Sequence, residues 1–288
     1  MTNPILHFST LLMGGLGNQI FQFCKTRDLE LKGYDVSIDT SNFEKFKNVS
    51  GLPYTHREQV FPIDYFGFQE SKNYIKKILD VGIKLNRNKL TPSYLDFAAL
   101  IHDKNLNQNS FRKYNRLIGY FQDVDLIYKH KEYLINSLSK NNSIKVALES
   151  KPQPGTTLLH VRRGDYLNME EELKIDFYTE ALIHCKKNIN NFSYEIFTDD
   201  YKWTSQQKIF QDSQQIHSDD NSVPSTISTF AEMLNFENFI VGNSTFSLVP
   251  ALIRETDKSK IITANPWFRN KDRNLNFRNS WVKIKNQI

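Results

Sequence analysis

The chain has 288 residues, of which 39% are hydrophobic and 24% charged, with 11 glycines and 9 prolines. This composition excludes a collagen, a disordered tail and a disulfide scaffold, and it predicts one large globular domain or two of ordinary size. The net charge of +5 suits an anionic ligand or surface. It does not indicate a nucleic-acid partner, because Asp and Glu are abundant as well.

Cysteine usage and the lack of targeting segments indicate the compartment. Cys24 and Cys185 lie far apart and have no metal-ligand spacing around them, so we expect two reduced, partly buried thiols. No apolar run reaches the ~18 residues needed to span a bilayer. Residues 1–13 lack the basic start and the cleavage site of a secretory signal. We therefore expect a cytoplasmic protein.

The first half of the chain opens like a parallel α/β sheet. Residues 6–13 predict a buried strand, 20–31 a helix that stops at Gly33, and 34–39 a second strand that ends in Asp39. Further along, the pattern predicts a basic amphipathic helix at 70–89, a strand at 115–120 and a helix at 124–139. The basic helix can lie on anionic lipid, or it can simply present a solvated face over a core.

A Pro- and Gly-containing stretch at 150–155 is the best linker in the chain. It divides the chain into an N-terminal α/β domain, 1–149, and a C-terminal α/β domain, 150–288. In the second domain the predicted strands cover 156–161, 194–198, 239–241 and 260–263, and the predicted helices 176–190 and 225–236, the latter with Ser225 as N-cap.

The motif His-Val-Arg-Arg-Gly-Asp-Tyr at 160–166 follows a predicted buried strand. Ligands of open α/β sheets bind at the carboxyl ends of the strands. Arg162 and Arg163 there can grip phosphate oxygens through their planar forks. Asp165 can orient one guanidinium, and His160 can donate a hydrogen bond. The alternative is an internal Arg–Asp ion pair that fixes the loop.

Two further polar segments lie at strand ends. Asp199 and Asp200 can accept hydrogen bonds from a guanine or a ribose, or they can cap a helix. Asn243, Ser244 and Thr245 stand where a strand turns into a helix, and such a segment makes an anion cradle or an ordinary cap.

The glycine loop at 14–19 fails the dinucleotide fingerprint, because Ile20 stands where a third glycine is required. It is not a P-loop either. Asn18 and Gln19, which follow Gly17 at a helix start, offer amides suited to sugar hydroxyls or a phosphate. Asp39 lies about where a ribose-binding acid would, which keeps a nucleotide-dependent oxidoreductase open as an alternative.

Asp123 and Asp125 match the Asp-x-Asp pattern by which some sugar transferases hold a divalent metal. The same acids are favoured at a helix start by electrostatics alone. The histidines are scattered and form no ligand set.

Taken in order, these motifs resemble the bacterial α-1,2-fucosyltransferases of glycosyltransferase family 11. The resemblance rests on 14–22 (Gly-Gly-Leu-Gly-Asn-Gln-Ile-Phe-Gln), on 160–166, on 197–200 (Phe-Thr-Asp-Asp) and on 243–247 (Asn-Ser-Thr-Phe-Ser), with Gly-Tyr-Phe-Gln at 119–122 and Pro-Trp-Phe at 266–268. Three features depart from the family. Leu248 and Val249 replace two tryptophans, 168–172 is shorter and lacks a His-Gly, and residues 1–11 extend the N-terminus.

The resemblance implies a GT-B fold, in which two Rossmann-like domains face each other across a cleft. It implies inverting transfer of L-fucose from GDP-fucose to a hydroxyl of an oligosaccharide or lipid-linked glycan such as O-antigen, with no obligatory metal or other cofactor. The enzyme would then work in the cytoplasm, with peripheral contact at the inner membrane face. Domain 1–149 would serve the acceptor and 150–288 the donor.

In this interpretation the expected catalytic residues are Arg162, His160 and Asp165. The expected donor-binding residues are Gly17, Asn18, Gln19, Arg163, Asp199, Asp200, Asn243, Ser244 and Thr245. Two alternatives remain open: a metal-dependent GT-A glycosyltransferase that uses Asp123 and Asp125, and a nucleotide-sugar-binding module without catalysis.

Overall fold

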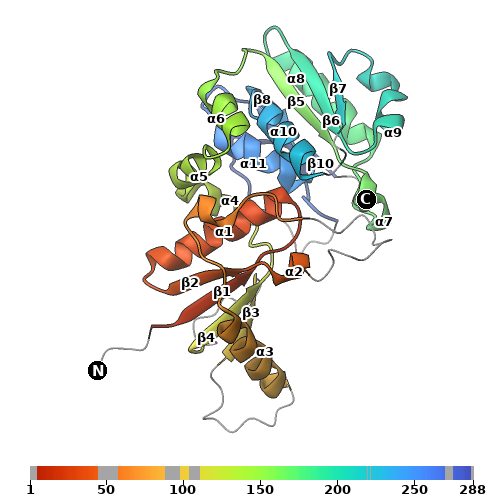
Figure 1. Ribbon diagram of the computed structural model, residues 1–288. Helices are drawn as coiled ribbons and strands as arrows, with labels where there is room; N and C mark the ends of the chain where they lie inside the picture. Colours follow the sequence, from red (N-terminus) through yellow and green to blue (C-terminus); the bar gives the residue numbers. More distant parts are fainter. Residues whose placement is uncertain are drawn as a thin grey trace. The chain divides into compact units, whose positions relative to one another are not determined.

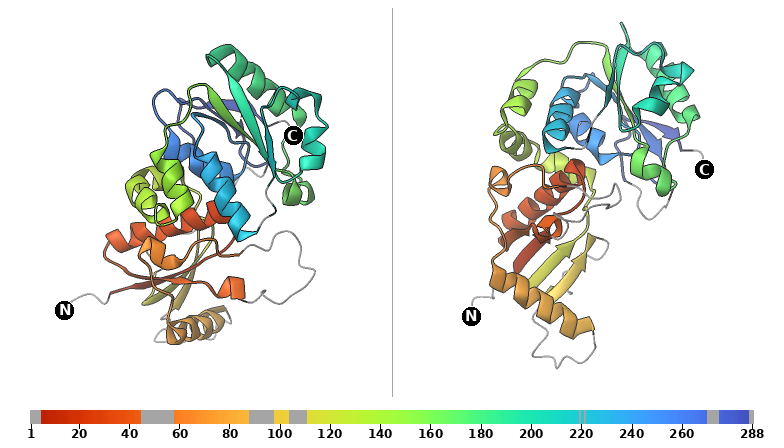
Figure 2. Two further views of the ribbon diagram at one scale, coloured as in Figure 1. Left: turned by 45° about the horizontal axis from the view of Figure 1, so that its top comes forward. Right: turned by 45° about the vertical axis from the view of Figure 1, so that its right-hand side comes forward.

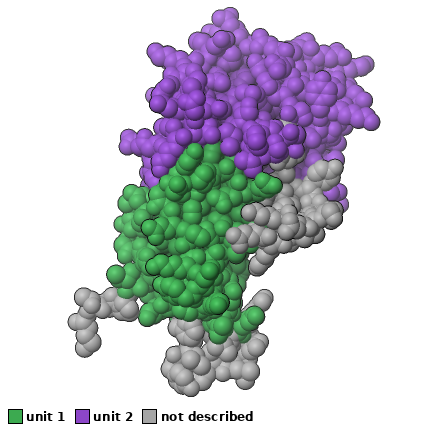
Figure 3. Space-filling model, viewed as in Figure 1, with its two compact units in different colours: residues 1–122 green, residues 123–288 purple. Residues whose placement is uncertain are grey.

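The computed structural model describes residues 5–44, 58–87, 98–103, 111–218, 220, 222–269 and 275–286. The chain forms two compact units, Met1–Gln122 and Asp123–Ile288, which Figure 3 distinguishes by colour. Each unit is a parallel α/β sheet with helices on both faces (Figure 1). The expected α/β fold with two Rossmann-like units is therefore confirmed.

The first unit has four parallel strands in the order β2-β1-β4-β3. Its elements are β1 (His7–Leu11), α1 (Leu16–Leu31), β2 (Asp35–Asp39), α2 (Ser41–Glu44), the 3-10 turn η1 (Ile63–Phe66), α3 (Asn73–Arg87), β3 (Ala98–His102) and β4 (Tyr114–Ile118). The described bounds of α1, β2, α3 and β4 agree with the predicted elements, although Lys89 lies outside the described residues.

The two faces of this first sheet differ in chemistry because side chains alternate along each strand. Phe8 and Thr10 point to α1, where Thr10 is hydrogen-bonded to Thr26. Ser9 and Arg116 lie on the opposite face, which α3 covers; Arg116 contacts Asp80 of that helix. The views in Figure 2 show α3 along β3 and β4, in agreement with its contacts.

The second unit has six parallel strands in the order β10-β9-β8-β5-β6-β7. Its elements are α4 (Val124–Lys129), α5 (Lys131–Leu138), α6 (Asn142–Glu149), β5 (Thr156–Val161), α7 (Gly164–Asn168), α8 (Ile175–Asn188), β6 (Ser193–Thr198), α9 (Tyr201–Ser205), the 3-10 turn η5 (Lys208–Phe210), β7 (Ile216–Ser218), α10 (Val223–Met233), β8 (Asn238–Ile240), α11 (Thr245–Arg254), β9 (Ile261–Asn265) and β10 (Val282–Lys285). Numbered within the unit, this is the Rossmann order 3-2-1-4-5-6.

Alternation along β5 builds the core of the second unit on both faces of the sheet. Leu159 and Val161 pack with Phe177 and Tyr178 of α8 in one buried apolar cluster. His160, on the other face, contacts Ser247 of α11. Figure 2 shows α8 on one side of this sheet and α10 and α11 on the other. The strands need apolar residues on both faces because neither face meets water.

We expected the boundary between the two units at 149–150. In the structure it lies at Gln122–Asp123. Helices α4 and α6 pack on α11 and α10, so residues 123–149 belong to the second unit. Arg254, the last residue of α11, donates hydrogen bonds to the carbonyls of Ala147, Leu148 and Ser150. The Pro- and Gly-containing stretch is therefore a connection within one unit.

Other sequence expectations need smaller corrections. Helix α10 begins after Ser222, whose Oγ accepts the Ser225 N–H at 3.3 Å, so Ser222 and not Ser225 is the N-cap. The helix predicted at 124–139 is divided at His130 into α4 and α5. Three short strands (β3, β7 and β10) and the helices α2, α6 and α7 were not predicted. Cys24 and Cys185 are buried free thiols, and burial raises the pKa of Cys185 to about 12.

Candidate active site at the switch point of the second sheet

The strand order of the second unit has a topological switch point. Chain connections run from β5 toward β7 on one side and from β8 toward β10 on the other, so the direction reverses between β5 and β8. Ligands of such sheets bind outside the carboxyl ends of these two strands. The motif at 160–166 stands at the end of β5, and Asn243 follows the end of β8.

Arg162 is held between two carboxylates at this edge. Its Nη1 lies 2.8 Å from Oδ2 of Asp199, and its Nε and Nη2 donate to Oδ1 of Asp165 at 3.0 and 2.6 Å. Burial alone would lower the pKa of Arg162, but the charges of Asp199 and Asp165 raise it. Two of the five N–H groups, on Nε and Nη2, donate to Asp165, and Nη1 is ion-paired with Asp199. Counting only the described residues, at least one N–H on each Nη remains for an anionic ligand.

Arg163 is fixed by an aromatic ring and a neighbouring acid. Its guanidinium stacks 3.8 Å from the ring centroid of Trp203, and its Nε donates to Asp200 at 3.1 Å. The other oxygen of Asp200 accepts the Trp203 N–H and caps α9, which confirms the capping interpretation for this residue. Trp203 was not identified as a site residue from the sequence, although an aromatic residue three positions after a capping acid can reach a neighbouring arginine.

Asp199 joins the two motifs at the strand ends. Val161 and Thr198 are paired in register, so the residues that follow them, Arg162 and Asp199, leave the sheet side by side. Oδ1 of Asp199 accepts the backbone N–H of Arg163 at 2.8 Å. Gly164 packs so closely that a Cβ there would lie 2.7 Å from Oδ2 of Asp199. Glycine at 164 therefore makes room for the carboxylate.

His160 is buried beneath this edge and binds α11. Its Nδ1 lies 2.9 Å from Oγ of Ser247, and that hydroxyl also lies 2.9 Å from the Val241 carbonyl. The hydroxyl proton goes to the carbonyl, so Nδ1 carries the imidazole proton. Burial and the charge of Arg162 lower the pKa of His160 to about 3, and the ring is neutral at pH 7. In this structure His160 connects a strand to a helix, and the catalytic role expected of it stays a prediction.

The loop after β8 is tied to the loop after β5. The Tyr166 hydroxyl donates to the Asn243 carbonyl at 3.0 Å, and the Asn243 amide donates to the Glu171 carbonyl at 2.6 Å. Ser244 caps α11, and its Oγ accepts from the N–H of Phe246. Thr245 is the first residue of this ten-residue helix. The start of α11 therefore lies at the same switch point as the arginines, and helix starts attract anions.

The charges of this site do not sum to a positive value. Two guanidinium groups face three carboxyl groups, those of Asp165, Asp199 and Asp200. An anion here would depend on directed N–H groups and not on a surplus of positive charge. Glu172, an acid close to Asp165 in the sequence, is paired with Lys174 and Arg269; desolvation alone would raise its pKa, but these partners lower it. Such an acid is a weak proton acceptor.

The glycine loop of the first unit is also built on close contacts. Gly14 has φ +77°, and a Cβ there would lie 2.8 Å from the ring of Tyr120. The Asn18 side chain accepts from the Gln122 amide at 2.8 Å, and Gln22 joins the Met13 N–H to the Gly119 carbonyl. The motifs at 14–22 and 119–122 therefore form one structure at the switch point between β1 and β4.

Gln19 has a different position from the one we expected. It is fully buried, and its amide nitrogen donates to the carbonyls of Gly14 and Glu58, while its oxygen accepts the N–H of Val60. All its polar atoms therefore serve the fold, and the structure does not support a ligand contact by this side chain. Gly17, in the first turn of α1, is likewise buried.

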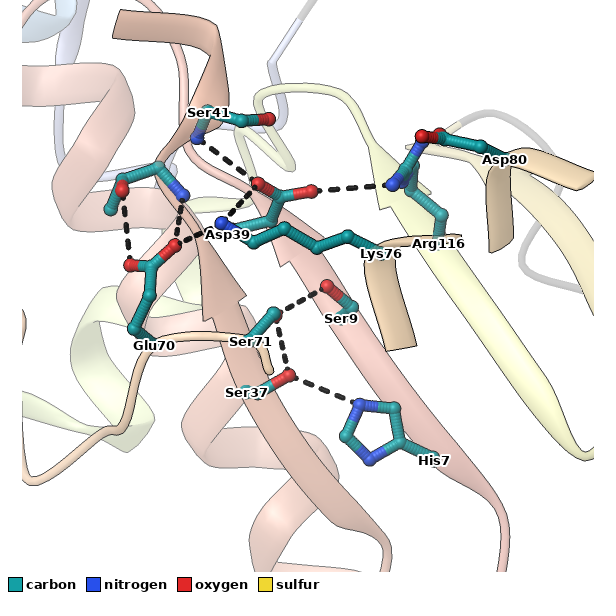
Figure 4. Close-up of polar contacts among 11 residues, drawn as sticks. His7, Ser9, Ser37, Asp39, Ser41, Glu70, Ser71, Lys76, Asp80 and Arg116 are labelled. Carbon is teal, nitrogen blue, oxygen red and sulfur yellow. Dashed lines mark hydrogen bonds and ion pairs between the residues drawn. The ribbon is translucent and has the colours of Figure 1, made fainter. Parts of the chain in front are cut away.

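Asp39 belongs to a polar cluster under α3 (Figure 4). Its carboxylate is completely buried and lies 3.4 Å from Nζ of Lys76 and 3.3 Å from Nη2 of Arg116. Beside it, a string of hydrogen bonds runs through Ser9, Ser71, Ser37 and His7. Asp39 thus neutralises cations of its own unit, which removes the ribose-binding interpretation and the main support for an oxidoreductase.

The Asp-x-Asp pattern also has a structural explanation. Asp123 is the N-cap of α4, and its Oδ1 accepts the Asp125 N–H at 3.0 Å. Within the described part of the chain, no group of three or more His, Cys, Asp or Glu residues is arranged to hold a metal ion. Among those same residues, no helix is long and apolar enough to cross a membrane.

Comparison with known proteins defines the class as a glycosyltransferase. The family model described as "Glycosyl transferase family 11" matches residues 69–285. The chain belongs to this family, in agreement with the resemblance found in the sequence. The match begins after the glycine loop, so the motifs of the second unit and the one at 119–122 lie inside it.

Two curated relatives match over nearly their whole length. The "O-antigen biosynthesis glycosyltransferase WbnK" of Escherichia coli is 26% identical, and the alignment covers 95% of this chain and 99% of the relative. The "Alpha-1,2-colitosyltransferase" of Escherichia coli is also 26% identical, with 95% of this chain and 97% of the relative covered.

Solved structures show a more distant likeness. A family 9 glycosyl transferase from Veillonella parvula aligns with 100% of this chain and 89% of its own, at 11% identity and a TM-score of 0.45. The α-1,6-fucosyltransferase NodZ from Bradyrhizobium, co-crystallised with GDP, aligns with 87% of this chain and 93% of its own, at 12% identity and a TM-score of 0.42.

Proposed function

We propose that this glycosyltransferase moves L-fucose from GDP-fucose, with inversion, to a hydroxyl of a bacterial surface glycan such as O-antigen. The linkage proposed is α-1,2 to a galactose-type residue. The observation that carries the proposal is Arg162, held at the switch point of a Rossmann-ordered sheet with one N–H left on each Nη. One relative is named as a glycosyltransferase of O-antigen biosynthesis, which supports O-antigen as the acceptor glycan.

The chemistry follows from where charge develops. An acceptor hydroxyl displaces GDP from C1 of the sugar through an oxocarbenium-like transition state, and negative charge grows on the departing β-phosphate. Hydrogen bonds from the two remaining N–H groups of Arg162 strengthen as that charge grows, so they stabilise the transition state more than the ground state. The first turn of α11 can bind the same diphosphate through backbone N–H groups, with Asn243, Ser244 and Thr245 at its entrance.

The remaining donor contacts and the absence of a cofactor are part of the proposal. Arg163, Asp199 and Asp200 would shape the pocket beside Arg162. The donor contact expected of Asn18 stays a prediction. The reaction would need no metal, because directed N–H groups take the place of a cation at the diphosphate.

A second donor is favoured by a specific observation. One relative is named as a colitosyltransferase, and colitose is L-fucose without its 3-hydroxyl. GDP-linked colitose is therefore the competing donor. A site that hydrogen-bonds the 3-hydroxyl would reject colitose strongly, whereas an apolar site would not discriminate between the two as strongly.

The test is a transfer assay with purified protein and galactosides, using GDP-fucose, GDP-colitose, UDP-galactose and free GDP. Formation of an α-1,2-fucoside from GDP-fucose alone supports the proposal. Transfer from GDP-colitose alone would show that GDP-colitose, and not GDP-fucose, is the donor. Tight GDP binding with neither transfer nor donor hydrolysis would identify a binding module without catalysis.

The outward face of α3 supports a peripheral membrane contact, which we also propose. Lys72, Lys77 and Lys84 are exposed there, together with Tyr74 and Val81 at 55% and 54% exposure. Each lysine near an anionic surface contributes about 1 kcal/mol, so the contact would be weak and reversible. Sedimentation with phosphatidylglycerol vesicles, against neutral vesicles and a variant with all three lysines changed to Gln, tests it.

A further inference from the structure

The acid that faces Arg162 from the neighbouring strand has a role that sequence reasoning does not give it. We propose that Asp199 is a positioning residue, which holds the guanidinium of Arg162 and the backbone of Arg163 in place, and not a contact of the nucleotide base or ribose. This inference rests on the proposed function, because the benefit of a fixed guanidinium is stabilisation of a departing phosphate.

The first step is the number of acceptors that the position requires. Oδ1 of Asp199 accepts the N–H of Arg163 at 2.8 Å, and Oδ2 lies 2.8 Å from Nη1 of Arg162. Both oxygens therefore face N–H donors. A carboxylate offers two acceptor oxygens, whereas an amide offers one acceptor and one donor. Asparagine at 199 would turn its NH2 toward one of these donors and lose that contact.

The second step is the packing that holds the carboxylate. The Asp199 side chain is 8% exposed, and Gly164 approaches so closely that a Cβ would stand 2.7 Å from Oδ2. That carboxylate oxygen cannot give way without leaving Nη1 of Arg162. A methyl group at 164 therefore displaces the acid with no change of charge, which provides a second and independent way to disturb the same contact.

The third step is the electrostatic cost. Asp199 is a negative charge beside the place where a diphosphate would bind, and like charges weaken such binding. A residue kept only to bind the diphosphate would not be an acid there. Positioning explains why an acid stands at this place: the site gives up some donor affinity, and Arg162 is oriented before the phosphate leaves.

These steps predict different effects on turnover and on affinity. Asp199→Asn and Gly164→Ala should each lower kcat by about 10- to 100-fold, the effect of a small misplacement of a catalytic group. The donor KM and the Kd of GDP should stay the same or fall, since Asp199→Asn removes a repulsive charge. Asp212→Asn is the matched control, because Asp212 is an exposed acid of the same unit that pairs with Lys186. Its kinetics should equal those of the unaltered protein.

A spectroscopic measurement decides the question independently of transfer. With Asp199 on Nη1 and Asp165 on Nη2, rotation about the Nε–Cζ bond of Arg162 is blocked. Its Nη groups should therefore give separate, slowly exchanging 15N resonances, assigned by their loss in Arg162→Lys. In Asp199→Asn and Gly164→Ala, where Asp165 alone holds the guanidinium, the two resonances should exchange faster and broaden.

Two results would overturn the inference. One is separate Arg162 resonances that persist in both variants together with a kcat within twofold of the unaltered protein. The other is a parallel loss of kcat and of GDP affinity in Asp199→Asn, which would make Asp199 a nucleotide contact. If the unaltered protein transfers neither fucose nor colitose, the proposed function fails, and the resonances still decide whether Asp199 positions Arg162.

Discussion

The imidazole of His160 and the hydroxyl of Ser247 lie 2.9 Å apart, and they join the first strand of the second sheet to the helix that begins at its switch point. The ring is 4% exposed and neutral, since burial and the nearby Arg162 lower its pKa to about 3. This contact makes the stability of the second unit depend on pH.

Replacement of His160 by Gln should flatten that dependence. Between pH 6.5 and 3 the unfolded chain binds a proton at this residue and the folded chain does not, so the free energy of unfolding rises with pH. One group contributes about 1.4 kcal/mol per pH unit in this window. Urea unfolding at several pH values measures the slope.

The matched control for this measurement is His102→Gln, because His102 is exposed. That variant should keep the slope of the unaltered protein. A slope that is the same in all three proteins would show that His160 titrates normally in the folded state.

Arg162→Ala should lower kcat by about 10²- to 10³-fold, or about 3–4 kcal/mol of barrier, which is the usual cost of removing one preorganised donor group. Arg162→Lys should restore little of the lost kcat, because an ammonium group cannot contact Asp165, Asp199 and a phosphate with the geometry of a guanidinium. Steady-state kinetics with GDP-fucose measure both. Turnover close to that of the unaltered protein in Arg162→Ala would remove the phosphate role.

The two interpretations of Asp123 predict opposite results. If Asp123 only caps α4, Asp123→Asn should keep both stability and activity, since Asn caps as well as Asp, and Asp123→Ala should cost about 1 kcal/mol of stability. A chelator should leave the rate unchanged. A metal site would instead lose activity in Asp123→Asn and in chelator, with activity restored by Mn²⁺ or Mg²⁺.

Gly14→Ala and Gly33→Ala separate backbone strain from crowding. Both glycines have positive φ, +77° and +84°, but a Cβ at Gly33 meets nothing within 4 Å, whereas one at Gly14 would lie 2.8 Å from the Tyr120 ring. Gly33→Ala should cost about 1–2 kcal/mol for the left-handed backbone alone. Gly14→Ala should cost more, by about 1–3 kcal/mol of overpacking. If thermal unfolding shows the same loss of stability in both variants, the Tyr120 ring moves aside freely.

The sequence predicts those parts of the site that depend on strand ends. Arg162 and Asp199 follow strongly apolar strands, and parallel neighbours bring their carboxyl ends to one edge, so their proximity could be anticipated. The ion-pair and capping alternatives for Asp165, Asp199 and Asp200 also describe contacts that the structure contains. Whether these acids also touch a ligand is a separate question.

Other features depend on partners that no local pattern identifies. The amide of Gln19 is satisfied by Glu58 and Val60, and the carboxylate of Asp39 by Lys76 and Arg116. A motif residue whose polar atoms are hydrogen-bonded within the protein has the same local sequence pattern as one that faces a ligand. The short strands β3, β7 and β10 are missed for a related reason, since three to five residues of modest alternation gain their order from the sheet.

The guanidinium of Arg254 has a consequence for how this protein can be divided. It caps the carboxyl end of α6 by binding the carbonyls of Ala147, Leu148 and Ser150. A fragment that starts at Lys151 would lose the acceptors at Ala147, Leu148 and Ser150, would keep only the contact of Arg254 with the Leu234 carbonyl, and would uncover the flank of α10 on which α6 packs. A fragment that keeps these contacts of Arg254 therefore begins at Asp123, the first residue of the second unit.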